Sequence, residues 1–473
     1  MSWAFNFSGQ EETLKFISKN NIKILNLCHF PEDGRLKTLS FSVTDTERIH
    51  EILDMGERVD GSNLFSFVDP QKSDIYIAPD AKRAFIDPFS TLPTLNMLCD
   101  YLDENGKPLY AAPKSVLTRA EEHLRASKGA SLKALAELEF YIIARQQFDN
   151  LFPGMPERNY HESAPFTKFQ DTRNEILAIL ESCGMPTKYA HGEVGLINAT
   201  NGTMMEQHEI ELKPQSLVKM AETIAVSKWI IRNVCARHGT SVSFIPKIDL
   251  NHAGTGMHIH LCGFRDGRNF VPSPQGTISH EALKIIGGIL RFARSLSSFG
   301  NPTPISYLRF FARKESPMNV CWGARNRLAL LRVPLWWSFK KPEVNKEGCH
   351  ETFEYRAPDA FANAYLLFAG LAMAADYGLE NPGDSTKLAE DLHVDAAQAE
   401  TKSLKTLPSS CREAADKLEE DRDHYEANEV FPEKLVDGTI GKLRSFKDNL
   451  TWKEVQSAPE RIEKMIAEYL HYG

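Results

Sequence analysis

Two glutamates stand two residues apart inside an otherwise apolar run. The run ALAELEFYII (134–143) contains Glu137 and Glu139, and its other residues are typical of a buried β-strand. Because strand side chains alternate between faces, both carboxylates point the same way. Burying an ionised carboxylate costs several kcal/mol unless a partner compensates it. The run therefore predicts a compensating charge beside these glutamates.

The same spacing recurs in three further strand-like runs. The pairs are Glu209 and Glu211 in EQHEIEL (206–212), His258 and His260 in MHIHL (257–261), and Glu354 and Arg356 in TFEYR (352–356). Taken singly, each pair has an ordinary alternative, such as a glutamate that meets water or a packed histidine. Together they indicate divalent cations, more than one of them. Oxygen-rich ligation with one histidine favours Mg²⁺ or Mn²⁺, and no Cys/His spacing typical of structural zinc is found.

A second set of candidate residues is cationic. The segments 301–317 and 321–334, with TFEYR, contribute Arg309, Arg327, Arg332 and Arg356. Arginine on an apolar framework near metals suits the binding of phosphate or carboxylate oxygens. Surface salt bridges are the alternative, which fits Arg325 better than Arg332. Neither a Walker A motif nor a G-x-G-x-x-G motif occurs, so no P-loop or Rossmann nucleotide site is predicted.

The predicted secondary structure that positions these residues changes in type near residue 110. Before it, strand-like runs alternate with turns, and ILNLCHFPEDGRLKTLSFSV (24–43) predicts a β-hairpin. After it, helical segments alternate with strands that include SFIPKI (243–248), and the last part of the chain is helical. We predict a small mostly-β domain over 1–110 and a large α+β domain over 111–473 whose elements line one cavity. The apolar run 365–375 predicts a buried helix.

Composition narrows the functional class. The 473 residues carry a net charge of −8 that is spread along the chain, which argues against nucleic acid and anionic membranes as partners. The eight cysteines form no C-x-x-C pair, so we expect reduced thiols and a cytoplasmic location. The first residues lack the pattern of a signal peptide.

Several motifs, in order along the chain, resemble those of the glutamine synthetase family, type I in length. They are DGSN (60–63), PDAKRAFIDPF (79–89), ELEF (137–140), GEV (192–194), QHEIEL (207–212), GTGMHIH (254–260), NPTPISYLR (301–309), WGARNRLALLRVP (322–334) and FEYRAPDAFANAYL (353–366). The resemblance runs from about residue 24 nearly to the C-terminus. It implies an α+β protein with a small N-terminal β-grasp-like domain and a large catalytic domain. In that domain, antiparallel strands line a metal-containing funnel.

The resemblance also implies a role for each candidate residue. Ligands of the metal on the amino-acid side would be Glu139, Glu193 and Glu209. Ligands of the metal that bridges the ATP phosphates would be Glu137, His258 and Glu354. The residues implied to contact the substrate amino acid are Arg309 and Gly254. Those implied to contact ATP phosphates or the transferred phosphoryl are Arg327, Arg332 and Arg356, with His260 on the nucleotide side. Implied at the ammonium end are Tyr160, the flap residue Glu315, and Asp60 from a neighbouring subunit.

The implied reaction is ATP-dependent formation of an amide, L-glutamate and ammonia being the favoured substrates, through an acyl phosphate. A ligase for a polyamine or another organic amine is the alternative, and a non-catalytic binding homologue is the third possibility. Ala253 stands where the family has Asn at the amino-acid end, and Glu206 stands where it has Gly. The long segment between Glu193 and Glu209 is expected to be a loop at the substrate region. The family also implies a homo-oligomer, a dodecamer of two six-membered rings, with active sites between subunits. The Asn-Leu-Tyr-x-Leu-Pro stretch is absent near 390–410, so control by adenylylation is not expected.

Overall fold

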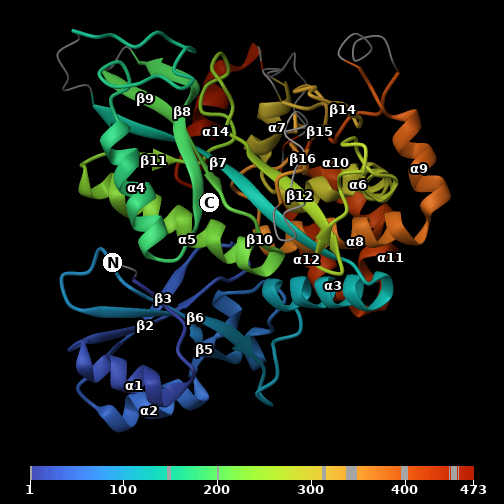
Figure 1. Cartoon of the computed structure of the whole chain (residues 1–473). Helices are drawn as coiled ribbons and strands as arrows, with labels where there is room; N and C mark the ends of the chain where they lie inside the picture. The colour runs from blue at the N-terminus through green and yellow to red at the C-terminus, as the bar shows by residue number, and fades with distance from the viewer. Residues whose placement is uncertain are drawn as a thin grey trace.

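The computed structural model describes residues 3–145, 151–199, 202–311, 316–336, 349–395, 403–446, 448, 455 and 457–473. Within these residues two sheets form, one of six strands near the N-terminus and one of ten strands after it. Figure 1 shows the smaller sheet, in blue, beneath the larger part of the molecule. The α+β class and the N-terminal β-grasp domain that the sequence predicted are confirmed.

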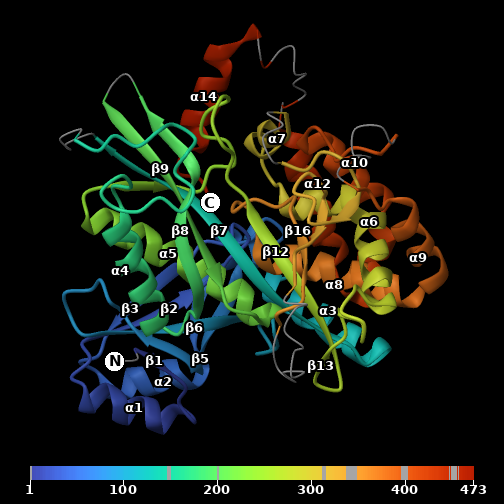
Figure 2. The ribbon, with the colours of Figure 1, turned by 45° about the horizontal axis from the view of Figure 1, so that its top comes forward.

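The N-terminal sheet surrounds a core of its own. Its strands are β1 (Ala4–Phe5), β2 (Ile24–His29), β3 (Lys37–Ser42), β4 (Glu57–Asp60), β5 (Asp74–Ile86) and β6 (Thr94–Leu102). Their order is β1-β5-β6-β2-β3, with β4 beside β5. Helices α1 (Gln10–Lys19) and α2 (Thr46–Met55) flank the sheet at the far end of the molecule from the large domain (Figure 2). The antiparallel pairing of β2 with β3 confirms the predicted hairpin.

The second sheet is built around the long strand β7 (Ser131–Arg145). Its other long strands are β8 (Thr187–Asn198), β9 (Thr203–Leu212) and β12 (Met257–Arg265). Shorter strands complete it: β10 (Gln215–Ser216), β11 (Ser241–Ser243), β13 (Arg268–Asn269), β14 (Trp322–Ala324), β15 (Leu331–Val333) and β16 (Phe353–Tyr355). The main order is β14-β15-β16-β12-β7-β9-β8, and every pairing except β14 with β15 is antiparallel.

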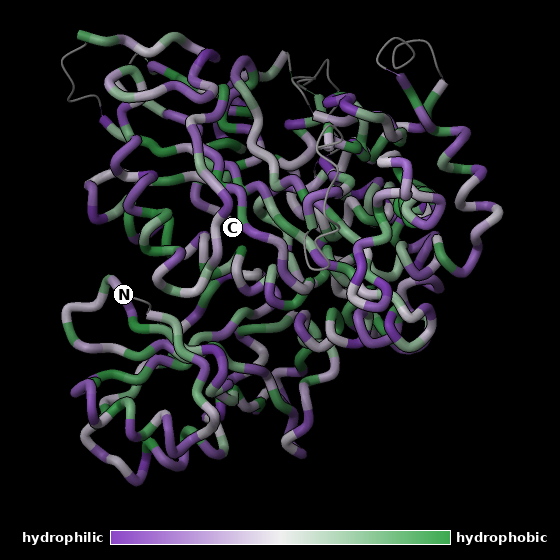
Figure 3. The backbone as a smooth tube through the Cα atoms, in the orientation of Figure 1, coloured by the Kyte–Doolittle hydropathy of each residue, from purple (hydrophilic) through white to green (hydrophobic). Residues whose placement is uncertain are grey.

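Helices pack on this sheet and on one another. They are α3 (Pro113–Lys128), α4 (Gln170–Ser182), α5 (Leu217–Arg237), α6 (His280–Gly300), α7 (Pro304–Phe311), α8 (Ala364–Glu380) and α9 (Pro382–Asp391). The C-terminal part adds α10 (Cys411–Glu420), α11 (Arg422–Glu426), α12 (Glu433–Ser445) and α14 (Pro459–Tyr469). Helix α4 packs on β8 and α5 on β7, whereas α6 packs on α8 (Figures 1 and 2). Hydrophobic and hydrophilic residues alternate along much of the chain, as Figure 3 shows.

Three local predictions can now be compared with the structure. The apolar run 365–375 lies in the buried helix α8, as predicted. The strand predicted over 243–248 is wrong beyond Ser243, where β11 ends. The loop expected between Glu193 and Glu209 is also wrong, since both sides continue the antiparallel pairing of β8 with β9. None of the helices that the structure describes is both long and apolar enough to cross a membrane.

The cysteine prediction needs one correction. Cys262 on β12 and Cys349 form a disulfide whose Cα atoms lie 6.1 Å apart, so the expectation of eight reduced thiols is wrong for this pair. The two residues are 87 positions apart in sequence. Cys349 comes close to Cys262 because the strand that follows it, β16, pairs with β12. The remaining six cysteines are buried thiols.

Candidate active site

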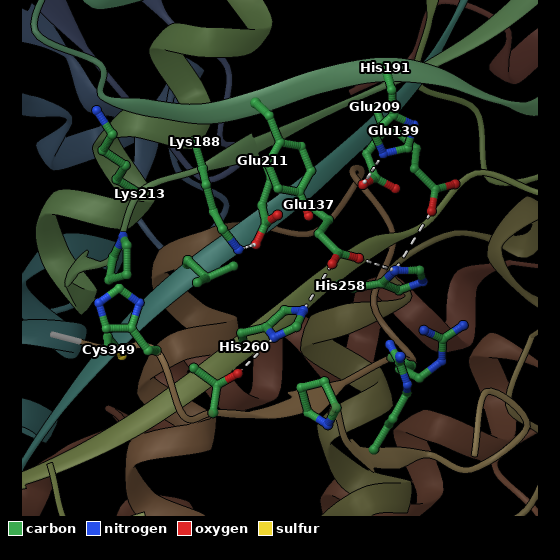
Figure 4. A pocket seen from close by; sticks show the side chains of 18 of the residues that line it. Glu137, Glu139, Lys188, His191, Glu209, Glu211, Lys213, His258, His260 and Cys349 are labelled. Carbon is green, nitrogen blue, oxygen red and sulfur yellow. Dashed lines mark hydrogen bonds and ion pairs between the residues drawn. The ribbon is translucent and has the colours of Figure 1, made fainter. Parts of the chain in front are cut away.

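Charged residues of neighbouring strands lie opposite one another across the second sheet. On β7, Glu137 pairs with Glu211 of β9 on one side and with His258 of β12 on the other. Neighbouring strands lie about 4.8 Å apart, so these side chains meet on one face. Figure 4 shows them projecting into a common space. The repeated spacing in the sequence is therefore one charged surface in the fold.

Two further sets of residues that pair across neighbouring strands extend this surface. Glu139 pairs with Glu209, which pairs with His191 of β8. Glu354 of β16 pairs with His260 on β12 and with Arg332 on β15. The alternate side chains of β7 and β12, such as Leu138 and Ile259, are fully buried in the core. Strand alternation thus separates an apolar face from a charged one.

The charged face forms the wall of a cavity of about 800 Å³. Five of the six predicted metal ligands line it, Glu354 being the exception. Further lining residues are Tyr160, His260, Arg327, Arg332 and Arg356. A smaller cavity of about 330 Å³ adjoins it and shares Glu139, Glu193, His258 and Arg356. Arg309 and Gly254 line this smaller cavity.

The structure brings the side chains of Glu137, His258 and Glu354 together. Nδ1 of His258 lies 2.8 Å from Oε2 of Glu137 and 3.7 Å from Oε1 of Glu354. His260 joins them, with Nε2 2.9 Å from Oε1 of Glu137. Burial alone would raise the pKa of Glu137, but the charges and hydrogen bonds of His260 and His258 lower it.

The second set depends on an irregularity in β8. The pairing of β8 with β9 shifts between Gly192 and Leu196, and this bulge contains Glu193. Nε2 of His191 lies 3.2 Å from Oε1 of Glu209. Burial, followed by the charges of Glu139 and Glu209, raises the pKa of Glu193 to about 8. Burial, with the charge of Glu137 next, also raises the pKa of Glu209. The positive charges near these two glutamates therefore do not balance the negative charge of the neighbouring carboxylates.

The donor atoms fit divalent cations. Within the described residues, two trios have ligand atoms within 4.8 Å of one another: Glu137 with His260 and Glu354, and His191 with Glu193 and Glu209. Carboxylates with one imidazole are ligands that Mg²⁺ and Mn²⁺ accept. A cation would also offset the charge that raises the pKa of Glu193 and Glu209. The trios differ from the predicted sets in one member each, His260 in place of His258 and His191 in place of Glu139.

Arginines lie beside these carboxylates and along the two cavities. Nη1 of Arg332 donates to Oε2 of Glu354 at 2.8 Å, and Arg356 donates to the other oxygen of that carboxylate. Nη1 of Arg309 donates to the carbonyls of Ala357 and Pro358 at 2.9 and 3.1 Å. Arg327 is an exposed lining residue of the large cavity. The guanidinium groups are therefore held beside the two cavities by the sheet and by backbone carbonyls.

Two glycines allow the close approach of Arg309. A Cβ at Gly254 would lie 3.0 Å from Cγ of Arg309. A Cβ at Gly256 would lie 2.7 Å from Nη2 of Arg309 and 2.8 Å from Nε2 of His258. Gly256 also donates its N–H to Oε2 of Glu139 at 2.9 Å. The glycines of GTGMHIH thus serve close packing at the site.

One predicted residue is described away from the cavities of this chain, and another cannot be placed. Asp60 ends β4 in the N-terminal sheet, where its Oδ1 accepts from the N–H of Ser62 at 2.9 Å. It is not a lining residue of either cavity. Glu315 lies outside the described residues.

Several residues at the site were missed by sequence reasoning. His191 stands two residues before Glu193, so the strand spacing used elsewhere could have found it. Gln207 donates to Oε2 of Glu139 at 3.1 Å and to the carbonyl of Gly254 at 2.9 Å. Glu157 lines the smaller cavity from an irregular segment, which offers no periodic signal.

Comparisons with known proteins agree with this geometry. Residues 110–465 match the family described as "Glutamine synthetase, catalytic domain", and residues 21–104 match "Glutamine synthetase, beta-Grasp domain". Over 466 residues the chain is 30% identical to the glutamine synthetase of Aquifex aeolicus, an alignment that covers 93% of this chain and 96% of that protein. It is also 29% identical over 460 residues to the 3-hydroxylaminophenol mutase of Cupriavidus pinatubonensis, covering 91% and 93% of the two chains.

Solved structures share the fold. Plasmodium falciparum glutamine synthetase has a TM-score of 0.79 at 20% identity and covers 97% of this chain and 98% of its own. Apo GmaS has a TM-score of 0.76 at 20% identity, with 95% and 100% covered. The matched regions span both sheets and carry the charged face described above. The chain belongs to the glutamine synthetase family.

Proposed function

We propose that this chain is an ATP-dependent ligase that joins L-glutamate to ammonia through an acyl phosphate. The observation that carries the proposal is the charged face, where carboxylates, histidines and arginines from five strands line one cavity. Such a surface, if it only packed the fold, would repel itself. A non-catalytic role is therefore disfavoured.

The chemistry follows from the charges that the reaction must hold. A carboxylate and ammonia do not condense in water, so transfer of the γ-phosphoryl of ATP to the carboxylate creates a leaving group. Arg332 and Arg356 are suited to hold phosphoryl oxygens, and Arg309 to hold a carboxylate. Bound Mg²⁺ or Mn²⁺ would supply charge neutralisation for the nucleotide and the acid. The residues to hold the ions are Glu137, His258 and Glu354, and Glu139, Glu193 and Glu209, with His191 and His260 beside them. Positioning and charge stabilisation are thus the work of this chain.

A ligase for an organic amine is the second candidate, and one feature favours it. Aromatic rings cluster at the cavity wall: the ring centroids of Tyr160 and His161 lie 4.2 Å apart, and those of Tyr160 and His191 5.3 Å apart. Tyr160 and Tyr189 are each 47% exposed. Such rings beside Glu209 and Glu211 suit an extended organic cation better than ammonium.

We also propose a homo-oligomer, formed in the cytoplasm, in which a neighbouring subunit supplies Asp60. In this chain Asp60 lies in the N-terminal sheet and lines neither cavity. Large apolar side chains are exposed in the same stretch of sequence as Tyr160, namely Leu151, Phe152, Met155 and Phe166. An interface would cover them. Size measurement in solution tests this point, and a monomer at all concentrations would contradict it.

Phosphate release tests the proposed reaction. Purified protein with ATP, Mg²⁺ and glutamate is expected to release phosphate when ammonium or hydroxylamine is added, with little release before. Release only with a polyamine or an aromatic amine would support the second candidate instead. The absence of release with every amine, in protein that still binds Mn²⁺, would refute both ligase proposals.

A further inference from the structure

The smaller cavity holds more acidic groups than the proposed metal sites require. Carboxylates of Glu139, Glu157 and Glu193 line it, opposite the guanidinium groups of Arg309 and Arg356. With Glu139 and Glu193 assigned to a metal, Glu157 remains without a role in the reaction proposed above. A cavity of about 330 Å³ with both charges suits a small zwitterion.

The backbone holds Glu157 at this cavity in an uncommon conformation. Its φ is +57°, in the left-handed region that residues with a side chain rarely adopt. The segment is fastened to the bulge of β8, where the N–H of Asn159 donates to the carbonyl of Val194 at 3.3 Å. The N–H of His161 donates to the carbonyl of Gly192 at 2.9 Å. A Cβ at Gly192 would lie 2.8 Å from the carbonyl oxygen of Asn159. The segment and the bulge therefore approach as closely as they do because residue 192 is glycine.

A buried network fixes the far end of the same segment. Glu206 on β9 is fully buried; its Oε2 accepts from the N–H of Lys168 at 2.9 Å, and its Oε1 accepts from the hydroxyl of Thr167. Nε2 of His208 lies 3.2 Å from Oε1 of Glu206. Glu206 thus anchors the segment to the sheet at a position where the family has glycine. Such strain and such anchoring are typical of functional positions.

Ala253 also lines the smaller cavity. Its carbonyl accepts from the hydroxyl of Tyr141 at 3.1 Å, and its side chain is only a methyl group. Glu157 and Ala253 line the same small cavity, so the carboxylate at 157 shares it with a position that offers no polar side chain of its own.

We propose that Glu157 is the specificity-determining residue that receives the α-ammonium group of the amino-acid substrate. The cavity then binds the zwitterion with its α-carboxylate toward Arg309 and its α-ammonium toward Glu157. The carboxylate at 157 supplies the polar contact that the methyl group at 253 does not. This inference rests on the proposed function, since it names the group by which the acid substrate is chosen.

Paired substrates test the proposal. Glutarate has the two carboxylates of glutamate and lacks its amino group. Glu157→Gln is expected to lower kcat/KM for glutamate by about 10–150-fold, the range for losing a hydrogen bond to a charged group, and to leave kcat/KM for glutarate and KM for ATP unchanged. Glu162→Gln, a glutamate of the same segment that lines neither cavity, is the matched control and is expected to change neither substrate.

The outcomes separate this inference from the proposed function. An equal loss for both acids, or no loss for glutamate, would overturn the role of Glu157 while the ligase proposal stands. If no acid supports phosphate release, the ligase proposal fails, and binding decides this inference. The rise in the midpoint of thermal unfolding caused by glutamate, relative to glutarate, should then disappear in Glu157→Gln. An unchanged difference, or none in the native protein, would overturn the inference.

Discussion

Raising the pH from 6 to 8 is expected to tighten Mn²⁺ binding by about 50-fold, because the ion must displace a proton from Glu193. The pKa of Glu193 in the metal-free protein is raised to about 8 by burial and by Glu139 and Glu209. Two pH units below that value, about 1% of the carboxyl is ionised, and each unit corresponds to about 1.4 kcal/mol. Glu209, whose pKa is also raised, can steepen the dependence further.

The same shift sets the pH dependence of stability without metal. Since the pKa of Glu193 rises from 4.5 to about 8 on folding, the folded state binds a proton that the unfolded state has lost. The free energy of unfolding is then highest, for this group, below pH 4.5 and falls as the pH rises to about 8. The fall amounts to about 4–5 kcal/mol at about 1.4 kcal/mol per unit. Saturating Mn²⁺ should remove it.

Isothermal titration of Mn²⁺ in two buffers with different ionisation enthalpies measures the protons released. We expect release of at least half a proton per ion at pH 7 and a dissociation constant that levels off above pH 8. Glu193→Gln should bind more weakly at every pH and lose one unit of slope. Identical heats in both buffers, with an affinity that does not change between pH 6 and 8, would refute the account of Glu193.

Three further changes have defined outcomes. Glu354→Ala removes the carboxylate that Arg332 and Arg356 share. It is expected to weaken Mn²⁺ binding by more than about 10-fold and to abolish turnover. Unchanged Mn²⁺ affinity, measured by titration, would exclude Glu354 as a ligand. Denatured protein kept from reductant should show six reactive thiols and show eight after reduction, and eight before reduction would contradict the Cys262–Cys349 pairing. Glu206→Ala leaves Lys168 and Thr167 without their buried acceptor and is expected to cost about 1–3 kcal/mol in unfolding by denaturant. A smaller loss than that of the half-buried control Glu162→Ala would show that the anchor is absent.

Strand alternation predicted the charged face, because a period of two needs only local sequence. The carboxylates of β7, β9 and β16 and the histidines of β12 lie on one face as the spacing required. Alternation does not say which strand lies next to which. The register that sets His260 opposite Glu354, in addition to His258 opposite Glu137, is a property of the assembled sheet.

Features outside regular strands could not be predicted. The bulge that carries Glu193 depends on the pairing partner, since a β-bulge is defined between two strands. Glu157 lies in a segment without periodicity, held by distant residues of β8 and β9. The pairing of Cys262 with Cys349 likewise follows from the return of the chain to β12, so spacing alone carried no signal for it.

Anomalous X-ray diffraction from crystals saturated with Mn²⁺ tests the central claim most directly, namely that divalent cations compensate the carboxylates on the buried strands. The account predicts one peak bounded by Glu137, His258 and Glu354 and another bounded by Glu139, Glu193 and Glu209, each about 2–2.5 Å from the ligand atoms. The same map decides whether His260 or His191 joins either ion. Ordered carboxylates at these positions with no anomalous peak beside them would contradict the account.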